Sequence, residues 1–171
     1  MNKIKLVRKL KRIGFNPNDF IIVCIGTKKA FLDSVGPRIG TNVSKNTNMI
    51  VYGTMADNCH ALSLEEKFAE IKKLYPDKKI LAIDACCTKC PEKLGRIELK
   101  KGPISPGAGV GKILPCIGDF SIKAFTADMN SLDLLFDPFI EVSHEKKAFK
   151  DYVDNAVDII SSAIIEINKL Y

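Results

Sequence analysis

Short apolar runs alternate along the chain with longer amphipathic stretches. Runs rich in β-branched and other apolar residues at 19–27, 49–55 and 79–86 are typical of strands buried on both faces of a sheet. A further strand is predicted at 123–128. The more alternating pattern at 95–101 indicates an edge or antiparallel strand.

Helix signals separate these runs. Residues 33–45 begin with Asp33, Ser34 and Pro37, which favour a helix start. Ser63 and Glu66 have the spacing of a capping box and predict a helix through Tyr75. This helix and a final one from His144 carry apolar residues at helical spacing: Leu64, Phe68, Ile71 and Leu74, and then Phe149, Val153, Val157, Ile160, Ile164 and Ile167.

Strands that alternate with helices predict the α/β class. We expect a three-layer α/β/α fold with a mostly parallel twisted sheet. The chain of 171 residues is long enough for one domain with a substantial core, and it shows no internal repeat or linker. The sequence therefore predicts a single domain over residues 1–171.

Positive charge is concentrated in residues 1–13. The six Lys and Arg residues of this segment equal the net charge of +6 of the whole chain, so the remainder is balanced. The favoured interpretation is a solvated helix that caps the fold. The alternative is a tether to nucleic acid, an acidic partner or an anionic membrane, with Ile4, Val7 and Leu10 along one helical face.

The apolar runs also bear on the location of the protein. None approaches the roughly 18 residues that a membrane helix needs, and no apolar run follows the basic segment as it does in a signal peptide. We expect a cytoplasmic protein without a membrane span, and nucleic acid as an unlikely partner. The six cysteines are then expected to stay reduced.

Two aspartates stand at predicted strand ends. Asp33 follows the first strand, and Asp84 lies in the last turn of the strand at 79–86. Ligands of open α/β sheets bind beyond the carboxyl ends of the strands, so both carboxylates are expected to face one crevice. Such a pair activates water or binds a metal, because each carboxylate perturbs the other. The structural alternative is that Asp33 caps a helix and Asp84 closes a turn.

Four segments carry a family resemblance: IGTKKAFLDSVGPRIG (25–40), GTMADNCHALSL (53–64), ILAIDA (80–85) and GPISPGAGVGKILPCIGDFSI (102–122). Together they resemble the spore-protease-like sporulation proteins of the YyaC type, over roughly residues 20 to 130. The same elements are similar to those of the germination protease, which degrades small acid-soluble spore proteins. A more distant resemblance is to the hydrogenase maturation endopeptidases, which have a related fold. The resemblance thus also implies a phosphorylase/hydrolase-like, maturation-endopeptidase-like fold.

The resemblance implies a function and a place for it. Residues Asp33 and Asp84 match the two aspartates implicated in catalysis in the germination protease. The implied activity is that of a sporulation-associated peptidase without a cofactor. Its substrate is a protein or peptide, with small acid-soluble spore proteins as candidates. The implied location is the spore or forespore compartment of a spore-forming bacterium.

The chain departs from the family pattern at the rim of this crevice. Lys28 stands where the family usually has an acidic or small polar residue, and Leu32 stands where it usually has Gly. These departures favour an alternative function, a non-catalytic sporulation protein that binds a peptide or spore protein in the same crevice. Fold and motif kinship do not choose between the two functions.

Metal chemistry is a further alternative. His60 lies in the loop after the second strand, and the distant maturation endopeptidases use an early acid, a strand-end Asp and a later His around nickel. Asp33, Asp84 and His60 are therefore the candidate ligands for a divalent metal. Cys87 and Cys90 form a C-x-x-C after Asp84, but a structural zinc site commonly needs a second pair. Ordinary thiols are favoured over a redox or metal role.

A Gly- and Pro-rich segment at 102–118 predicts a long loop. Its glycines fit neither the Walker A nor the dinucleotide pattern, because Pro106 and Lys112 occupy positions that need Gly. The glycines instead favour close approach of the backbone to a bound chain. Our candidates for substrate binding are Ser34, Gly107, Gly109 and Lys112.

Overall fold

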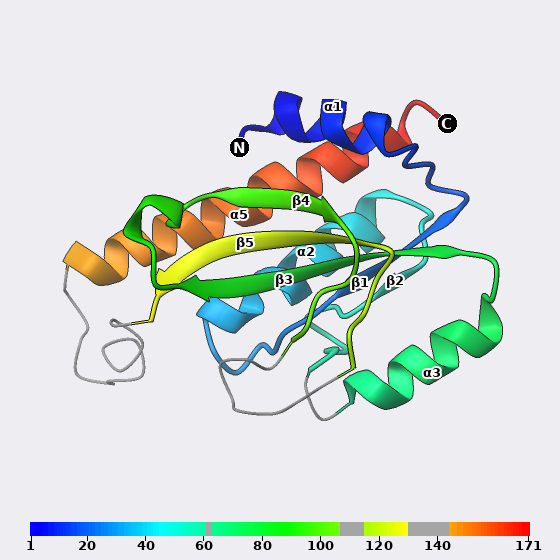
Figure 1. Cartoon of the computed structure of the whole chain (residues 1–171), viewed down its shortest axis with the longest axis horizontal. Coiled ribbons are helices and arrows are strands. Elements are labelled where there is room, and N and C mark those ends of the chain that lie inside the picture. Colours follow the sequence, from blue (N-terminus) through cyan, green and yellow to red (C-terminus); the bar gives the residue numbers. More distant parts are fainter. Residues whose placement is uncertain (61–62, 107–114, 130–143) are drawn as a thin grey trace.

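A five-stranded sheet forms the centre of the molecule (Figure 1). The structure is a computed structural model, and it describes residues 1–60, 63–106, 115–129 and 144–171. The strands in spatial order are β2 (Val51–Tyr52), β1 (Phe20–Cys24), β3 (Lys79–Thr88), β5 (Phe120–Asp128) and β4 (Ile97–Lys101). The first four are parallel. The edge strand β4 runs antiparallel to β5, as predicted.

Helices cover both faces of the sheet (Figure 1). The helices are α1 (Lys3–Arg12), α2 (Val35–Asn46), α3 (Leu64–Leu74) and α5 (His144–Asn168), with short 3-10 helices η1 (Leu32–Ser34) and η2 (Pro91–Lys93). Helices α1, α2 and α5 lie on one side, and α3 lies on the other. The predicted α/β class with a mostly parallel sheet is confirmed.

Strand β3 shows why the sheet is buried on both faces. Leu81 and Ile83 point into the core beneath α2 and α5, whereas Ile80 and Ala82 point into the core beneath α3. Successive side chains of a strand alternate between faces, so a strand covered on both sides needs an unbroken apolar run. Each fully buried Ile or Leu contributes roughly 1.5–3 kcal/mol to folding.

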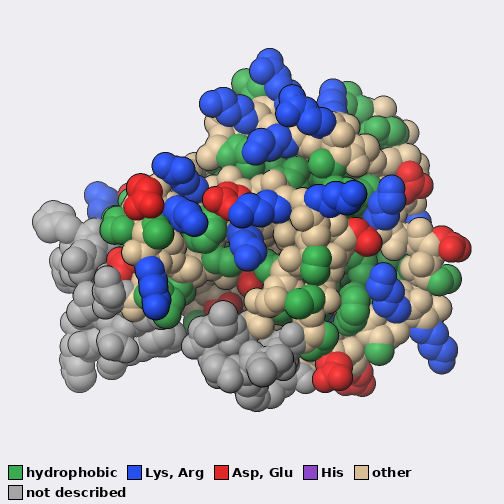
Figure 2. Space-filling model, viewed as in Figure 1, with side chains coloured by type: hydrophobic (Ala, Val, Ile, Leu, Met, Phe, Trp, Pro, Cys, Tyr) green, Lys and Arg blue, Asp and Glu red, His purple; other side chains and the backbone are tan. Residues whose placement is uncertain are grey.

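The basic helix α1 packs on the fold through Leu6, Val7 and Leu10, which are buried. Ile4 remains 57% exposed, so it does not share the packing face with Val7 and Leu10. Lys and Arg side chains gather over this helix at the top of Figure 2. The predicted packing of this segment against the fold is confirmed. No helix among the described residues has the length and apolar character that crossing a membrane requires.

Three local predictions are wrong in detail. The strand expected at 49–55 shrinks to Val51–Tyr52. Ser63 makes no side-chain cap on α3, because its hydroxyl donates instead to the carbonyl oxygen of His60, at 3.3 Å. Leu74 is 54% exposed, so the apolar face of α3 ends before it.

Candidate active site

Asp84 lies inside the sheet, on the central strand β3. It is only 9% exposed. Its neighbour across the parallel ladder is Lys123 on β5. Burial is the largest influence on the pKa of Asp84 and raises it, because the charged carboxylate loses water, and the positive charge of Lys123 opposes this rise.

Asp33 comes to the same place from the segment that follows β1. It lies in η1, and its backbone carbonyl accepts a hydrogen bond from the N–H of Thr27 at 3.0 Å. Gly26 permits this turn, because its φ of 138° is unfavourable for other residues and a Cβ there would collide with the Asp33 carbonyl oxygen. The turn places Asp33 beyond the carboxyl end of β1.

The two carboxyl groups interact. The negative charge of Asp33 adds to the effect of burial and raises the pKa of Asp84 to about 8. Burial also raises the pKa of Asp33, but a backbone hydrogen bond from Thr27 and the charge of His60 oppose this rise. Near neutral pH, Asp84 therefore holds a proton more firmly than Asp33 does.

His60 lies near Asp33, and it is held there by backbone pairing. Cys59 forms a parallel bridge with Ile25, and its carbonyl accepts the N–H of Gly26 at 3.0 Å. The N–H of Ser63 donates to the carbonyl of His60 at 2.9 Å. Asp33 thus interacts electrostatically with both Asp84 and His60, the other two residues singled out from the sequence.

These side chains do not form a preformed metal centre in the structure. Within the described part of the chain, no three His, Cys, Asp or Glu side chains are grouped so that they could hold a metal ion. Any site built on Asp33, Asp84 and His60 needs the side chains to rearrange around the metal.

The cysteines after Asp84 are free thiols. Cys87 lies close to both carboxyl groups. Burial raises the pKa of its thiol, and the charges of Asp33 and Asp84 raise it further. A thiol whose pKa is raised stays protonated and is a poor nucleophile. The sequence did not indicate that Cys87 lies near both carboxyl groups. A bulge between Cys86 and Cys87 shifts the register of β3 against β5 at this point.

The predicted substrate-binding residues have different outcomes. Ser34 is buried and donates its hydroxyl proton to the carbonyl oxygen of Phe31 at 2.6 Å. Gly107, Gly109 and Lys112 lie outside the described residues. Lys123 was missed by the sequence analysis. Its predicted strand was correct, but only the observed pairing of β5 with β3 places it beside Asp84.

A family model agrees with the resemblance drawn from the motifs. Residues 2–142 match the model described as "Protein of unknown function (DUF1256)". The chain belongs to this family. The uncharacterized protein YyaC of Bacillus subtilis (strain 168), a curated relative, is 38% identical over 105 residues, or 60% of this chain. The match spans only about half of that relative, 51% of its length. The resemblance to the YyaC type is thereby confirmed.

Similar solved structures add little to what the DUF1256 family indicates. The [NiFe] hydrogenase maturation protease HycI from Thermococcus kodakarensis KOD1 has 15% identity and a TM-score of 0.47, covering 85% of this chain and 91% of its own. A peptidyl-tRNA hydrolase in complex with N-propanol has 14% identity and a TM-score of 0.46, covering 91% and 96%. At these values neither similarity carries a functional argument.

Proposed function

We propose that this DUF1256 protein is a sporulation-associated peptidase that acts through Asp33 and Asp84. The observation that carries the proposal is the pair of interacting carboxyl groups at the carboxyl end of the sheet, with the pKa of Asp84 raised to about 8 by burial and by Asp33. Such a pair provides an acid and a base at one pH. Small acid-soluble spore proteins are the candidate substrates, on the resemblance to the germination protease.

The two groups have complementary roles in peptide hydrolysis. The Asp33 carboxylate accepts a proton from water as the water oxygen bonds to the peptide carbon, and Asp84 donates its proton to the carbonyl oxygen. The resulting tetrahedral diol then collapses. The proton on Asp33 passes to the leaving nitrogen, the C–N bond breaks, and a diol proton returns to Asp84. Each acid–base role contributes typically 10²–10⁴-fold to the rate.

Specific observations also favour two alternative functions. Lys28 and Leu32 at the rim depart from the family pattern and favour a non-catalytic protein that binds a peptide. The electrostatic interaction between His60 and Asp33 favours a metal-dependent endopeptidase, in which these residues and Asp84 take up a divalent metal. Both alternatives predict outcomes that differ from those of the two-aspartate peptidase.

A digestion assay tests the proposal. Wild type and Asp84→Asn are incubated with small acid-soluble spore proteins and with a denatured general substrate, after dialysis against chelator or with added divalent metal. We expect cleavage by wild type without metal and a loss of about 10²–10⁴-fold in Asp84→Asn. Asp77→Asn, which removes an exposed carboxylate in the turn before β3, serves as the matched control and should cleave normally.

The outcomes separate the alternatives. Cleavage only with added metal would favour the metal-dependent endopeptidase. No cleavage under any condition, with binding of the spore proteins retained, would favour the non-catalytic protein. If wild type does cleave, kcat/KM should fall as the pH rises through about 8, because Asp84 then loses the proton that it donates.

A further inference from the structure

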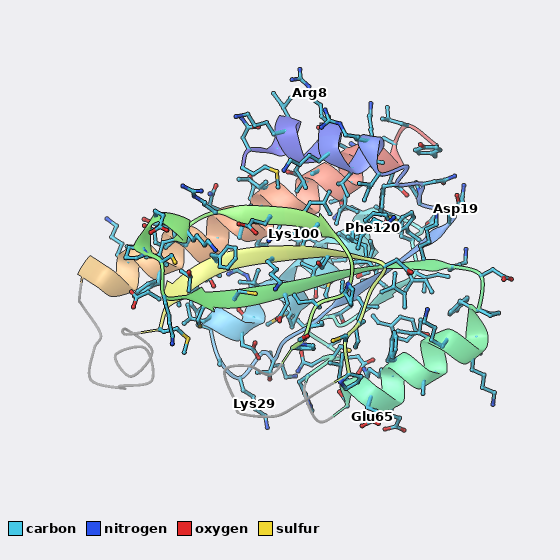
Figure 3. All side chains as sticks on the ribbon, in the orientation of Figure 1. Arg8, Asp19, Lys29, Glu65, Lys100 and Phe120 are labelled. Atoms are coloured by element: carbon cyan, nitrogen blue, oxygen red, sulfur yellow. The ribbon has the colours of Figure 1, made fainter. Side chains whose placement is uncertain are left out.

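A basic pocket lies beside Ser34, the residue that follows Asp33. It has a volume of about 600 Å³ and is lined by Lys28, Lys29, Arg38 and Lys150, together with Phe31 and Asp154. The four cations come from the loop after β1, from α2 and from α5. Figure 3 shows Lys29 on that loop, with its side chain extending away from the sheet. We call this site the basic pocket.

Asp154 holds two of the four cations in place. Its Oδ1 accepts a hydrogen bond from Nη2 of Arg38 at 2.7 Å, and its Oδ2 accepts one from Nζ of Lys150 at 2.6 Å. These hydrogen bonds lower the pKa of Asp154, so it stays ionised. One carboxylate thus balances one of four positive charges, and the pocket keeps a surplus of positive charge that attracts an anion.

Arg38 has hydrogen-bonding capacity left over. Its Nη1 is buried and has no hydrogen-bond partner among the described residues. A buried donor without a partner is costly, and a guanidinium pairs best with a carboxylate through two parallel hydrogen bonds. A carboxylate in the pocket would let the guanidinium turn and satisfy this group, while Lys150 keeps Asp154 paired.

The pocket also offers an apolar surface. Phe31 is 49% exposed, and its ring centroid lies 5.8 Å from the guanidinium carbon of Arg38. Met55 lines the same pocket. Apolar surface beside cations suits an acidic side chain with its methylenes, or an acidic residue next to an apolar one. A nucleic acid instead requires a stripe of cations along its phosphates, and Asp154 would repel them.

The place of the pocket links it to the proposed chemistry. Ser34 lines the pocket and directly follows Asp33, and Lys28 directly follows Thr27, whose N–H binds the Asp33 carbonyl. The segment that carries Asp33 thus also supplies residues of the basic pocket. We propose that the basic pocket is a specificity subsite that binds an acidic side chain of the peptide substrate. This inference rests on the proposed function for its substrate class.

Binding to an inactive protein tests the subsite apart from catalysis. Asp84→Asn is titrated into two fluorescent peptides of equal length, one with a Glu-Glu-Leu core and one with a Gln-Gln-Leu core, and anisotropy is measured. We expect the acidic peptide to bind more tightly. Adding Lys28→Gln and Lys29→Gln should weaken its binding by about tenfold, at about two- to fivefold for each exposed charge.

A matched control removes the same charge elsewhere. Lys5→Gln with Lys9→Gln on α1 leaves the pocket intact and should not change binding of the acidic peptide. Equal melting temperatures of the two double variants establish that folding is not the cause. A Lys150→Gln variant, which leaves Asp154 paired with Arg38, should weaken binding of the acidic peptide alone.

Several results would overturn the subsite. The first two are equal affinity for both peptides and equal weakening of acidic-peptide binding by the α1 double variant. A third is no binding of the acidic peptide at the highest attainable protein concentration. The last is binding of a single-stranded RNA oligonucleotide that is tighter than binding of the acidic peptide and depends on Lys28 and Lys29. The proposed peptidase activity is contradicted by a different result. Selective binding of the acidic peptide without cleavage by wild type would contradict the peptidase but support the subsite. Cleavage without a charge preference would support the peptidase and contradict the subsite.

Discussion

The two ends of the sheet are built from the same strands but from different chemistry. At the amino end, the ring of Phe20 packs against Phe15, with centroids 4.8 Å apart, and against Phe120, at 5.8 Å. Figure 3 labels Phe120 at this end. At the carboxyl end, β3 buries Asp84 beside Asp33. Apolar burial at the amino end stabilises the fold, whereas the buried carboxyl group at the carboxyl end destabilises it.

This contrast separates the residues that stabilise the fold from those proposed for catalysis. Burying an aromatic side chain stabilises folding, whereas burying a carboxyl group costs free energy unless the group takes up a proton. A site that retains a destabilising buried carboxyl group is a candidate for function, because titratable groups with perturbed pKa values cluster at active sites. Mutations at the amino end should therefore lower stability and spare the proposed activity, whereas mutation of Asp84 should lower the activity and spare or raise stability.

The largest effect on stability is expected at the amino end. Phe20→Ala removes a ring that is 1% exposed and leaves a cavity between Phe15 and Phe120. We expect the free energy of unfolding to fall by about 3–5 kcal/mol, measured by urea denaturation. Because the carboxyl end is untouched, the fraction that stays folded should keep its cleavage activity. Loss of activity in fully folded Phe20→Ala would break the separation of the two ends.

The next effect is a gain of stability at the carboxyl end. Between about pH 4 and about pH 8, folded wild type holds a proton on Asp84 that the unfolded chain has released, so its unfolding free energy falls as the pH rises. The side chain introduced by Asp84→Asn is uncharged at every pH in this range. The variant should match wild type near pH 4 and become the more stable of the two as the pH rises, by at most about 5 kcal/mol near pH 8, since each pH unit contributes about 1.4 kcal/mol at most.

The same urea titrations at several pH values check this sign. Asp77→Asn, the exposed control, should show no such divergence from wild type. If Asp84→Asn is less stable than wild type at pH 8, then the carboxylate has a structural role and the contrast between the two ends is wrong.

The smallest effect is expected away from both ends. Lys3 on α1 forms an ion pair with Glu166 on α5 at 2.9 Å, and both side chains are 46% exposed. Exposed pairs contribute about 0–1 kcal/mol, and salt screens them. Lys3→Gln should therefore change the unfolding free energy by less than about 1 kcal/mol, with no dependence on pH near neutrality. A larger loss would show that the docking of α1 depends on this pair.

The sequence predicted the sheet well because apolar burial leaves a regular pattern. The unbroken run at 79–86 indicated a doubly covered strand, and its extension to Thr88 changes nothing in its placement. The same topology brought Asp33 and Asp84 together, since parallel strands end at one edge. Ser63 failed as a cap because a local hydrogen bond to His60 competes with the helix end.

The residues of the basic pocket come together only in the folded protein, and no pattern in the sequence indicates the pocket. The cations of the basic pocket come from positions 28, 29, 38 and 150, and no local spacing relates Arg38 to Lys150. Composition directed attention to α1 instead, where six cations lie in one helix. Lys28 departs from the family pattern, but its neighbours in the pocket are defined only by the packing of α5 beside α2.

The most direct test of the central claim is the titration of Asp84 itself. Carbon-13 NMR of the aspartate side-chain carboxyl groups, with Asp84→Asn to assign the signal, gives its pKa in wild type and in Asp33→Asn. We expect Asp84 to titrate near pH 8 in wild type and at a lower pH in Asp33→Asn, where the neighbouring charge is gone. An Asp84 signal that titrates near pH 4 in both proteins would contradict the coupled pair and the mechanism built on it.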